Sequence, residues 1–153
     1  MFQRGGPDLA ICVGATVLSP DAPVMSQAFR IAFADDDPEQ GYLLSSVLRC
    51  RGFEVLPFAS GDDLLGWAER DDGRADAVLL DNDMPGRDGV ECCRALRTLP
   101  AFASVPIAFV TGSRAPGLHS RAHDAGARRV IDKDETMLDR LVLWLDEALS
   151  GPR

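Results

Sequence analysis

Five short apolar runs, each followed by an amphipathic stretch, limit the folds open to this chain more than any other feature of its sequence. The runs are predicted strands at 30–34, 53–58, 75–80, 105–110 and 128–131, and the amphipathic stretches are predicted helices at 38–51, 60–70, 88–99, 117–126 and 134–149. Alternation of strand and helix at this spacing predicts a parallel sheet with helices on both faces and right-handed crossovers. The sequence therefore indicates an α/β fold of the (βα)5 type.

Local residue preferences support the starts of these helices. Asp37 precedes Pro38 and has Gln40 three residues on, which is typical of an N-cap followed by a first-turn proline. Asp88 and Glu91 have the spacing of a capping box. These signals place helix starts independently of the apolar pattern.

Length and composition predict one folded domain. A chain of 153 residues with 46% hydrophobic and 26% charged residues has a globular rather than a disordered composition. The net charge of −8 would repel a phosphate backbone or an anionic membrane. We therefore expect no nucleic acid and no membrane as direct partners.

The domain itself is predicted over 30–150. Residues 1–29 are poor in charge and interrupted by glycine and proline, so we expect a loose N-terminal extension, or sequence upstream of a true start at Met25. The apolar stretch at 9–18 has about half of the ~20 residues that a spanning helix needs, which favours a cytoplasmic protein. Only Ser-Gly-Pro-Arg follows Leu149, so no output domain is expected.

Acidic groups gather where the predicted strands end. The first strand leads into Asp35-Asp36-Asp37, the third into Asp81-Asn82-Asp83, the fourth into Thr111-Gly112 and the fifth into Asp132-Lys133-Asp134. In open α/β sheets, ligands bind beyond the carboxyl ends of the strands. Carboxylates held this close need a cation or a proton to neutralise them. Oxygen donors without histidine or cysteine favour a hard cation, Mg²⁺ or Mn²⁺.

Each of these residues also has a purely structural interpretation. Asp37 is accounted for as an N-cap, Thr111 can simply end a strand, and Lys133 can be a solvated surface charge. One cap needs only one of the three aspartates, so Asp35 and Asp36 are left without a structural role. The grouping at four strand ends favours a functional site over these separate explanations.

From Arg30 to Leu149 the chain resembles the receiver domain of two-component response regulators. The resemblance rests on four motifs in the family's order and spacing, IAFADDDPE at 31–39, VLLDNDMPGRDG at 78–89, VTG at 110–112 and DKD at 132–134. It implies the flavodoxin-like, doubly wound fold of the chemotaxis regulator, with a five-stranded parallel sheet in the order 2-1-3-4-5. It also implies a bacterial phosphorelay signalling protein of the single-domain type.

The resemblance assigns the acidic residues as follows. Asp81 would be the phosphoacceptor and a metal ligand, and Asp36 would bind Mg²⁺ directly. Asp35 would act through a water molecule, and the backbone carbonyl of Asp83 would complete the protein's share of the coordination. Met84-Pro85 and Gly89 would shape the loop after the acceptor.

Two further residues would contact the phosphoryl group itself. Thr111 would hydrogen-bond its oxygens, and Lys133 would pair with another of them. Lys133 is the only lysine among the sixteen lysines and arginines of the chain. A compact ammonium on a flexible stem suits this role.

The implied function is transfer of a phosphoryl group to Asp81 from a histidine kinase or a histidine phosphotransfer protein, with Mg²⁺, followed by altered binding of a downstream protein. Such a domain is not an enzyme beyond self-phosphotransfer and slow autodephosphorylation. Two alternatives stay open. One is a degenerate receiver that binds a partner without phosphorylation. The other is a small phosphatase with an aspartate nucleophile, suggested by Asp81-x-Asp83 after an apolar strand. In the haloacid-dehalogenase-like pattern, however, the nucleophile motif follows the first strand, whereas here it follows the third.

The chain departs from the receiver pattern at two positions. Asp134 follows the lysine where the family usually has proline, which removes a turn constraint and adds a carboxylate, although Asp134 can serve as the N-cap of the last helix. Val130 occupies the position of the aromatic switch residue. Both departures affect the readout of phosphorylation rather than its chemistry.

The remaining candidates are interpreted as structural. His119 and His123 stand four apart on a predicted helix and lack an evident third metal ligand. The four cysteines lack metal-ligand spacing and are predicted to be free thiols, with the adjacent pair packing in a helix (Cys12, Cys50, Cys92 and Cys93). Trp67 and Trp144 are predicted to be partly buried packing residues.

Overall fold

The five strands form one parallel sheet in the order β2-β1-β3-β4-β5. The computed structural model describes residues 28–150, so the predicted extension at 1–29 lies almost entirely outside the described residues. The strands are β1 (Arg30–Ala34), β2 (Glu54–Phe58), β3 (Ala77–Leu80), β4 (Ile107–Thr111) and β5 (Arg129–Asp132). The predicted α/β class and the strand order are confirmed.

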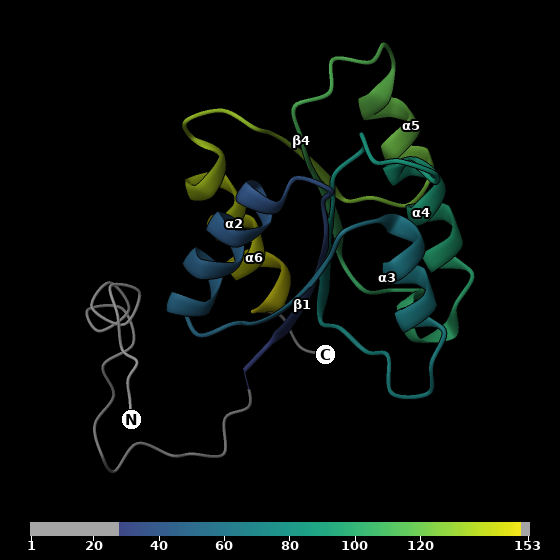
Figure 1. The fold of residues 1–153 in the computed structure, drawn as a ribbon, viewed down its shortest axis with the longest axis horizontal. Helices are drawn as coiled ribbons and strands as arrows, with labels where there is room; N and C mark the ends of the chain where they lie inside the picture. The colour runs from purple at the N-terminus through teal and green to yellow at the C-terminus, as the bar shows by residue number, and fades with distance from the viewer. Residues whose placement is uncertain (1–27, 151–153) are drawn as a thin grey trace.

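Helices cover both faces of the sheet, as Figure 1 shows. Two of them, α2 (Pro38–Cys50) and α6 (Met137–Leu149), lie on one side. The other side carries α3 (Gly61–Ala68), α4 (Gly89–Arg97) and α5 (Leu118–Asp124). A short 3₁₀ helix, η1 (Pro100–Phe102), leads toward β4. The doubly wound arrangement follows from the parallel pairing, because each crossover needs a helix on one face.

The sheet divides the core into two apolar clusters. Alternate residues of a strand point to opposite faces. Ala32 and Ala34 of β1 therefore pack with α3, α4 and α5. Ile31 and Phe33 of the same strand pack with α2 and α6. The strands β3 and β4 are buried at every residue, which explains why their sequences are apolar runs rather than alternating patterns.

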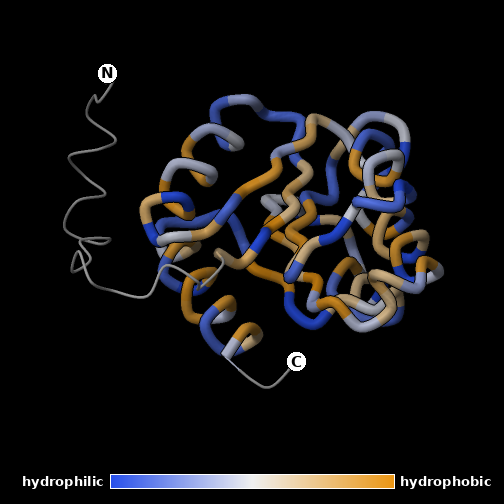
Figure 2. The backbone as a smooth tube through the Cα atoms, turned by 90° about the horizontal axis from the view of Figure 1, so that it is seen from below, coloured by the Kyte–Doolittle hydropathy of each residue, from blue (hydrophilic) through white to orange (hydrophobic). Residues whose placement is uncertain are grey.

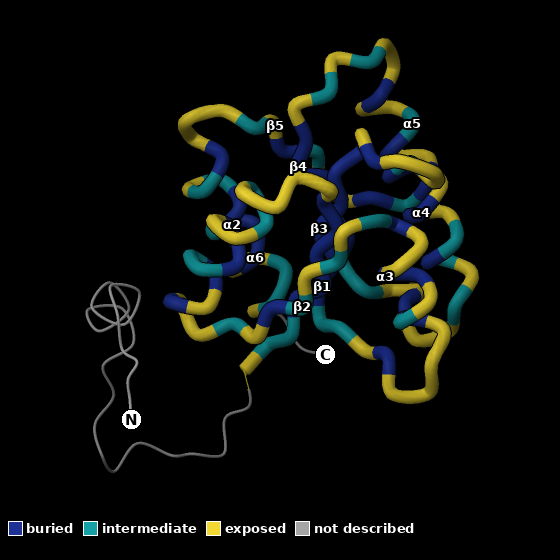
Figure 3. Tube along the Cα trace, viewed as in Figure 1, coloured by how far each residue is buried: buried dark blue, intermediate teal, exposed yellow. Residues whose placement is uncertain are grey.

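The distribution of hydropathy and burial agrees with these two clusters. Figure 2 shows hydrophobic segments gathered toward the middle of the molecule and hydrophilic segments along its outside. Figure 3 shows the buried strands between helices whose outer surfaces are exposed. Both tryptophans are packing residues, as predicted. Trp67 is partly buried against the cluster under α3, α4 and α5, whereas Trp144 is buried in the α2–α6 cluster more completely than predicted.

Two predicted caps are confirmed and one is wrong. The Asp37 carboxylate accepts hydrogen bonds from the N–H groups of Glu39 and Gln40, and Asp88 forms a complete capping box with Glu91. Asp134 is not the N-cap of α6, because that helix begins at Met137 with Thr136 in the cap position. The turn after β5 takes up the intervening residues, so α6 starts later than the apolar pattern suggests.

The prediction of free thiols is right for two described cysteines and wrong for one. Cys92 and Cys93 are free and fully buried, and burial raises the pKa of Cys92 to about 12. Cys50 is disulfide-bonded. The prediction went wrong because domain size shows only that a disulfide is not required for folding; it does not exclude one.

None of the helices within residues 28–150 combines the length and apolar character needed to cross a membrane.

Candidate functional site

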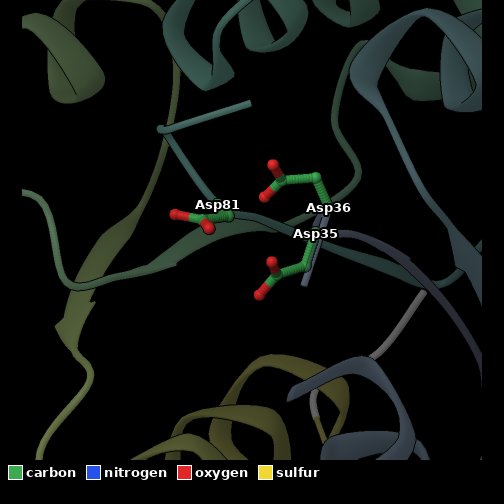
Figure 4. Close-up of side chains that lie close together, drawn as sticks. All are labelled: Asp35, Asp36 and Asp81. Atoms are coloured by element: carbon green, nitrogen blue, oxygen red, sulfur yellow. The ribbon is translucent and has the colours of Figure 1, made fainter. Parts of the chain in front are cut away.

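Three carboxylates meet at the carboxyl end of the sheet. Asp35 and Asp36 follow β1, and Asp81 follows β3, which pairs with β1 in parallel. Figure 4 shows the three side chains together, and each offers an oxygen within 4.8 Å of the others. Parallel pairing brings these carboxyl strand ends to one edge, so residues 46 positions apart become neighbours.

Lys133 joins this cluster from the other half of the sheet. It follows β5, and its ammonium nitrogen lies 2.7 Å from Asp35 Oδ2 and 3.2 Å from Asp81 Oδ2. Its side chain is only 18% exposed, so the contacts lie in a largely shielded environment. One ammonium therefore bridges the two buried carboxylates.

Backbone N–H groups hold the other carboxylate oxygens. The N–H of Asp37 donates to Asp35 Oδ1 at 2.9 Å, and the N–H of Asp83 donates to Asp81 Oδ1 at 3.3 Å. Both oxygens of Asp35 and of Asp81 are thus engaged. The Asp36 carboxylate is exposed, and no hydrogen bond or ion pair within residues 28–150 involves it.

Three carboxylates and one ammonium leave the cluster with more negative than positive charge. Burial raises the pKa of Asp35, and the nearby charge of Asp81 adds to this, against the opposing hydrogen bonds from Lys133 and Asp37. Burial by itself would lower the pKa of Lys133, but the hydrogen bond to Asp35 and the charges of Asp81 and Asp35 raise it overall. Two buried carboxylates share one ammonium, so a further cation would be favoured here.

The donor set suits a hard divalent cation. All three clustered side chains supply oxygen, and within residues 28–150 no other group of metal-ligating side chains has this compactness. Carboxylate, carbonyl and water oxygens are preferred by Mg²⁺ and Mn²⁺. Asp36 is the side chain best placed to bind such an ion, because neither of its oxygens has another partner in the described part of the chain.

Thr111 and Asp83 lie beside the cluster without completing it. Thr111 ends β4, is fully buried, and its Oγ1 accepts a hydrogen bond from the N–H of Ser113 at 3.1 Å. Its carbonyl accepts from the N–H of Lys133 at 3.0 Å, which ties the ends of β4 and β5 together. Asp83 contacts Asp81 through its N–H group; the predicted role of its carbonyl stays a prediction.

The loop after Asp81 is closed by residues that sequence reasoning only partly identified. Asn82 is buried, its Oδ1 accepts from the N–H of Val90, and its carbonyl accepts from the N–H of Gly89. A Cβ atom at Gly89 would lie 2.7 Å from the carbonyl oxygen of Asp81. Gly89 was predicted to shape this loop. The contacts of Asn82 and Ser113 were missed, although both are local: Asn82 bonds to Val90 eight residues on, and Ser113 to Thr111 two residues back.

The two departures from the family pattern have separate structural explanations. The exposed Asp134 carboxylate accepts hydrogen bonds from Thr136 and pairs with Arg140 at 3.0 Å. The hydrogen bonds from Thr136, more than the contribution of Arg140, lower the pKa of Asp134. Val130 is half-buried and packs against the cluster under α3, α4 and α5.

The remaining sequence candidates lie outside the cluster. His119 and His123 are exposed on α5 and line a shallow 220 Å³ pocket with Arg128 and Arg129, with no third metal-ligating side chain among its lining residues. The Cys92 thiol lies 3.8 Å from the carbonyl oxygen of Gly61, which is consistent with packing between α3 and α4.

Comparison with known proteins places the chain among signalling proteins. The family model described as "Response regulator receiver domain" matches residues 31–143. The chain is 36% identical over 105 residues to the cyclic di-GMP phosphodiesterase response regulator RpfG of Xanthomonas campestris, covering 67% of this chain and 26% of that protein. It is 30% identical over 130 residues to the transcriptional regulatory protein BaeR of Escherichia coli, covering 78% and 52% respectively. The chain thus spans only part of these relatives.

Solved structures show the same architecture. The chemotaxis protein CheY4 of Vibrio cholerae matches with a TM-score of 0.72 and 25% identity over 81% of this chain and 100% of its own. The receiver domain of the sensor histidine kinase PA1611 of Pseudomonas aeruginosa matches with a TM-score of 0.72 and 26% identity over 81% of this chain and 99% of its own. That receiver domain holds a magnesium ion in its active site cleft.

The family match covers well over half of the 153 residues, and the three aspartates of the carboxylate cluster lie within the matched range. The chain belongs to the family of response regulator receiver domains.

Proposed function

We propose that Asp81 accepts a phosphoryl group from the phosphohistidine of a histidine kinase or a phosphotransfer protein, and that the phosphorylated domain signals by altered binding of a downstream protein. The observation that carries this proposal is the position of Asp81 in the cluster. Its carboxylate contacts Lys133, and oxygens of two other acidic residues lie within 4.8 Å.

Accessibility favours Asp81 over Asp35 as the nucleophile. The Asp35 side chain is 0% exposed, whereas that of Asp81 is 8% exposed at the rim of the site. Asp35 is also held by the shorter contact to Lys133. A phosphoryl donor can therefore reach Asp81 while Asp35 stays behind it as a fixed negative charge.

The transfer is a substitution at phosphorus. A carboxylate oxygen of Asp81 forms a bond to phosphorus as the bond from phosphorus to the donor's imidazole nitrogen breaks, and the nitrogen keeps the electron pair. Catalysis of this step is mainly positioning and neutralisation of the phosphoryl oxygens. The Lys133 ammonium is already beside Asp81 and can turn from it to a phosphoryl oxygen.

The proposed metal residues act on the same charge. Asp36 and Asp81 would hold Mg²⁺ or Mn²⁺ directly, with Asp35 through water and the carbonyl of Asp83 as a further ligand. A bound divalent cation supplies additional neutralisation of the phosphoryl oxygens. Thr111 has its Oγ1 engaged as an acceptor by Ser113, which leaves its own proton free to be donated toward the phosphoryl group.

Labelling with a small phosphodonor tests the proposal. Wild type incubated with acetyl phosphate and Mg²⁺ should gain one acid-stable, base-labile phosphoryl group by intact-mass measurement. Asp81→Asn should gain none, because an amide is not a nucleophile there, and Asp83→Asn serves as the matched control that keeps labelling. Full labelling of Asp81→Asn would show that another carboxylate reacts.

The same assay separates the alternatives. A wild type that is never labelled by acetyl phosphate or by a kinase indicates a receiver that binds without phosphorylation. Steady release of phosphate from an organic phosphate ester would instead indicate a phosphatase with an aspartate nucleophile. A single labelling event with slow loss of the group supports the receiver.

A further inference from the structure

An arginine of the helix that follows Lys133 forms hydrogen bonds with the turn that carries this lysine. The turn runs from the end of β5 at Asp132 to the start of α6 at Met137. Arg140 lies in the first part of α6, and its guanidinium reaches back over the turn. It is therefore placed to act on the backbone that presents Lys133.

Arg140 contacts the residue on each side of Lys133. Its Nη2 donates to the carbonyl of Asp132 at 3.1 Å and lies 3.0 Å from both oxygens of the Asp134 carboxylate. Its Nε donates to Thr136 Oγ1 at 3.0 Å, and that hydroxyl in turn donates to Asp134 Oδ1 at 2.8 Å. The four residues form a closed network around the turn.

Stabilisation of α6 does not explain this arrangement. A cation near a helix N-terminus opposes the helix dipole, so an arginine at this position is unfavourable for the helix itself. The cap residue, Thr136, makes no side-chain capping bond. Isolated surface ion pairs contribute little to stability, whereas charged groups in a network of fixed geometry are the exception.

A constraint on the turn would add to the contacts that Lys133 makes itself. The backbone N–H of Lys133 is held by the carbonyl of Thr111, but its side chain is long and must reach across β4 to Asp81. A lysine side chain has high rotamer entropy, so the position of its backbone decides how well its ammonium bridges two carboxylates.

We propose that Arg140, with Asp134 and Thr136, forms a clamp that positions Lys133 on Asp35 and Asp81. The residues of the clamp do not touch the reacting atoms, so they are positioning residues. Their effect on phosphotransfer rests on the proposed function of Asp81, but their effect on Lys133 does not. Asp134, the acidic residue that follows the lysine, thus helps to hold the turn through its pair with Arg140.

The chain offers a direct probe, because Lys133 is its only lysine. Labelling the full-length protein with ¹³C-lysine gives the NMR signals of this side chain alone. The variants are Arg140→Gln and Asp134→Asn. The matched control is Arg70→Gln, which breaks a comparable exposed pair with Asp72, whose oxygens lie 3.2 Å from the guanidinium.

In wild type the two ε protons of Lys133 should be inequivalent, since the ammonium is held in one place. In Arg140→Gln they should converge toward the averaged values of a free lysine, with a smaller change of the same kind in Asp134→Asn. The double variant should change the lysine signals little more than Arg140→Gln does, because contacting residues are coupled.

The second measurement is the rate of phosphotransfer. Labelling by acetyl phosphate should slow about tenfold in Arg140→Gln, as expected for loss of a supporting contact. Arg70→Gln should match wild type in both measurements.

Unchanged Lys133 signals in Arg140→Gln would overturn the clamp, even if labelling slowed, because the rate would then fall for another reason. Equal changes in Arg70→Gln would overturn it as well. Thermal unfolding followed by circular dichroism confirms that each variant is folded at the temperature used. If wild type is not labelled at all, the proposed function fails, while the lysine signals still decide whether the clamp exists.

Discussion

At the scale of single residues, the site depends on how one ammonium compensates two buried carboxylates. Lys133 bridges Asp35 and Asp81, and Asp36 is left with no partner among the described residues. The excess negative charge makes cation binding favourable. Substitution of Asp36 should therefore weaken that binding measurably.

Mg²⁺ should stabilise the protein against thermal unfolding. A ligand that binds only the folded state adds about 2.7 kcal/mol at a concentration of 100 times its Kd. Asp36→Ala should lose most of the rise in melting temperature, whereas Asp83→Ala should keep it, because only the carbonyl of Asp83 is a proposed ligand. The rise should weaken in acid as protons compete for the carboxylates. An undiminished rise in Asp36→Ala would contradict the proposed site.

Lys133→Met should destabilise the protein at neutral pH by about 3 kcal/mol, near the low end for a broken buried pair because the lysine side chain is 18% exposed. Urea unfolding measures this loss, with Arg70→Met as the matched surface control. Part of the loss should be recovered with Mg²⁺, which supplies the missing positive charge.

The pH dependence of the same variant has a definite sign. Burial already raises the pKa of Asp35 above 3.8 in the folded protein, so its protonated form favours folding and its contribution falls as pH rises above 3.8. Removing the ammonium raises that pKa further. The stability deficit of Lys133→Met should therefore shrink as pH is lowered toward about 4. A deficit that grows in acid would contradict this.

At the scale of elements, the loop between β3 and α4 fixes the position of Asp81. The loop closes through Asn82 and Gly89, and Met84 is buried in the core beneath it. Its geometry leaves no room for a side chain at Gly89, where a Cβ would lie 2.8 Å from the ring of Phe109 and 2.9 Å from the Cα of Asn82.

Gly89→Ala should therefore destabilise the protein by about 1–3 kcal/mol, the usual cost of overpacking a core. It should also slow labelling of Asp81, because the clash falls on that residue's own carbonyl. Gly66→Ala in α3 is the control, since a Cβ atom there would have no neighbouring atom within 4 Å and alanine should stabilise the helix by about 0.5–1 kcal/mol. Urea unfolding should show that the free energy of unfolding falls in Gly89→Ala and rises in Gly66→Ala. Changes of the same sign in both variants would refute the steric argument.

At the scale of the whole molecule, the packing of the two apolar clusters limits which elements can move when Asp81 is phosphorylated. Val130 packs against the cluster under α3, α4 and α5, and it is half-buried. A β-branched side chain is stiff and too short to swing as an aromatic ring would. A ligand shifts an equilibrium only through contacts that differ between the two states.

Beryllofluoride, a phosphoryl mimic, should thus change hydrogen exchange mainly in the loops after β3, β4 and β5. Those loops contain or adjoin Asp81, Thr111 and Lys133. Little change is expected across 117–130 and 134–149. Asp81→Asn with beryllofluoride is the control and should show no change. Large changes in protection throughout α5 and α6 would contradict this view of the readout.

The sequence alone determined the fold class, the strand order through the family resemblance, two of the caps and the residues of the carboxylate cluster. These features follow from local patterns: apolar runs, first-turn residues, and the rule that parallel strands bring their carboxyl ends to one edge. Strand and helix bounds differed by a few residues, because ends depend on neighbours as well as on propensity.

Only the tertiary structure decided which partners the long and buried side chains take. Lys133 could have been solvated, Asp134 could have capped α6, and Arg140 carried no signal in the sequence; the structure pairs Lys133 with two carboxylates and Arg140 with the turn around it. The disulfide at Cys50 belongs here too. Such choices depend on distances between segments far apart in the chain and on which competing partner is buried nearby, and neither is encoded in local periodicity.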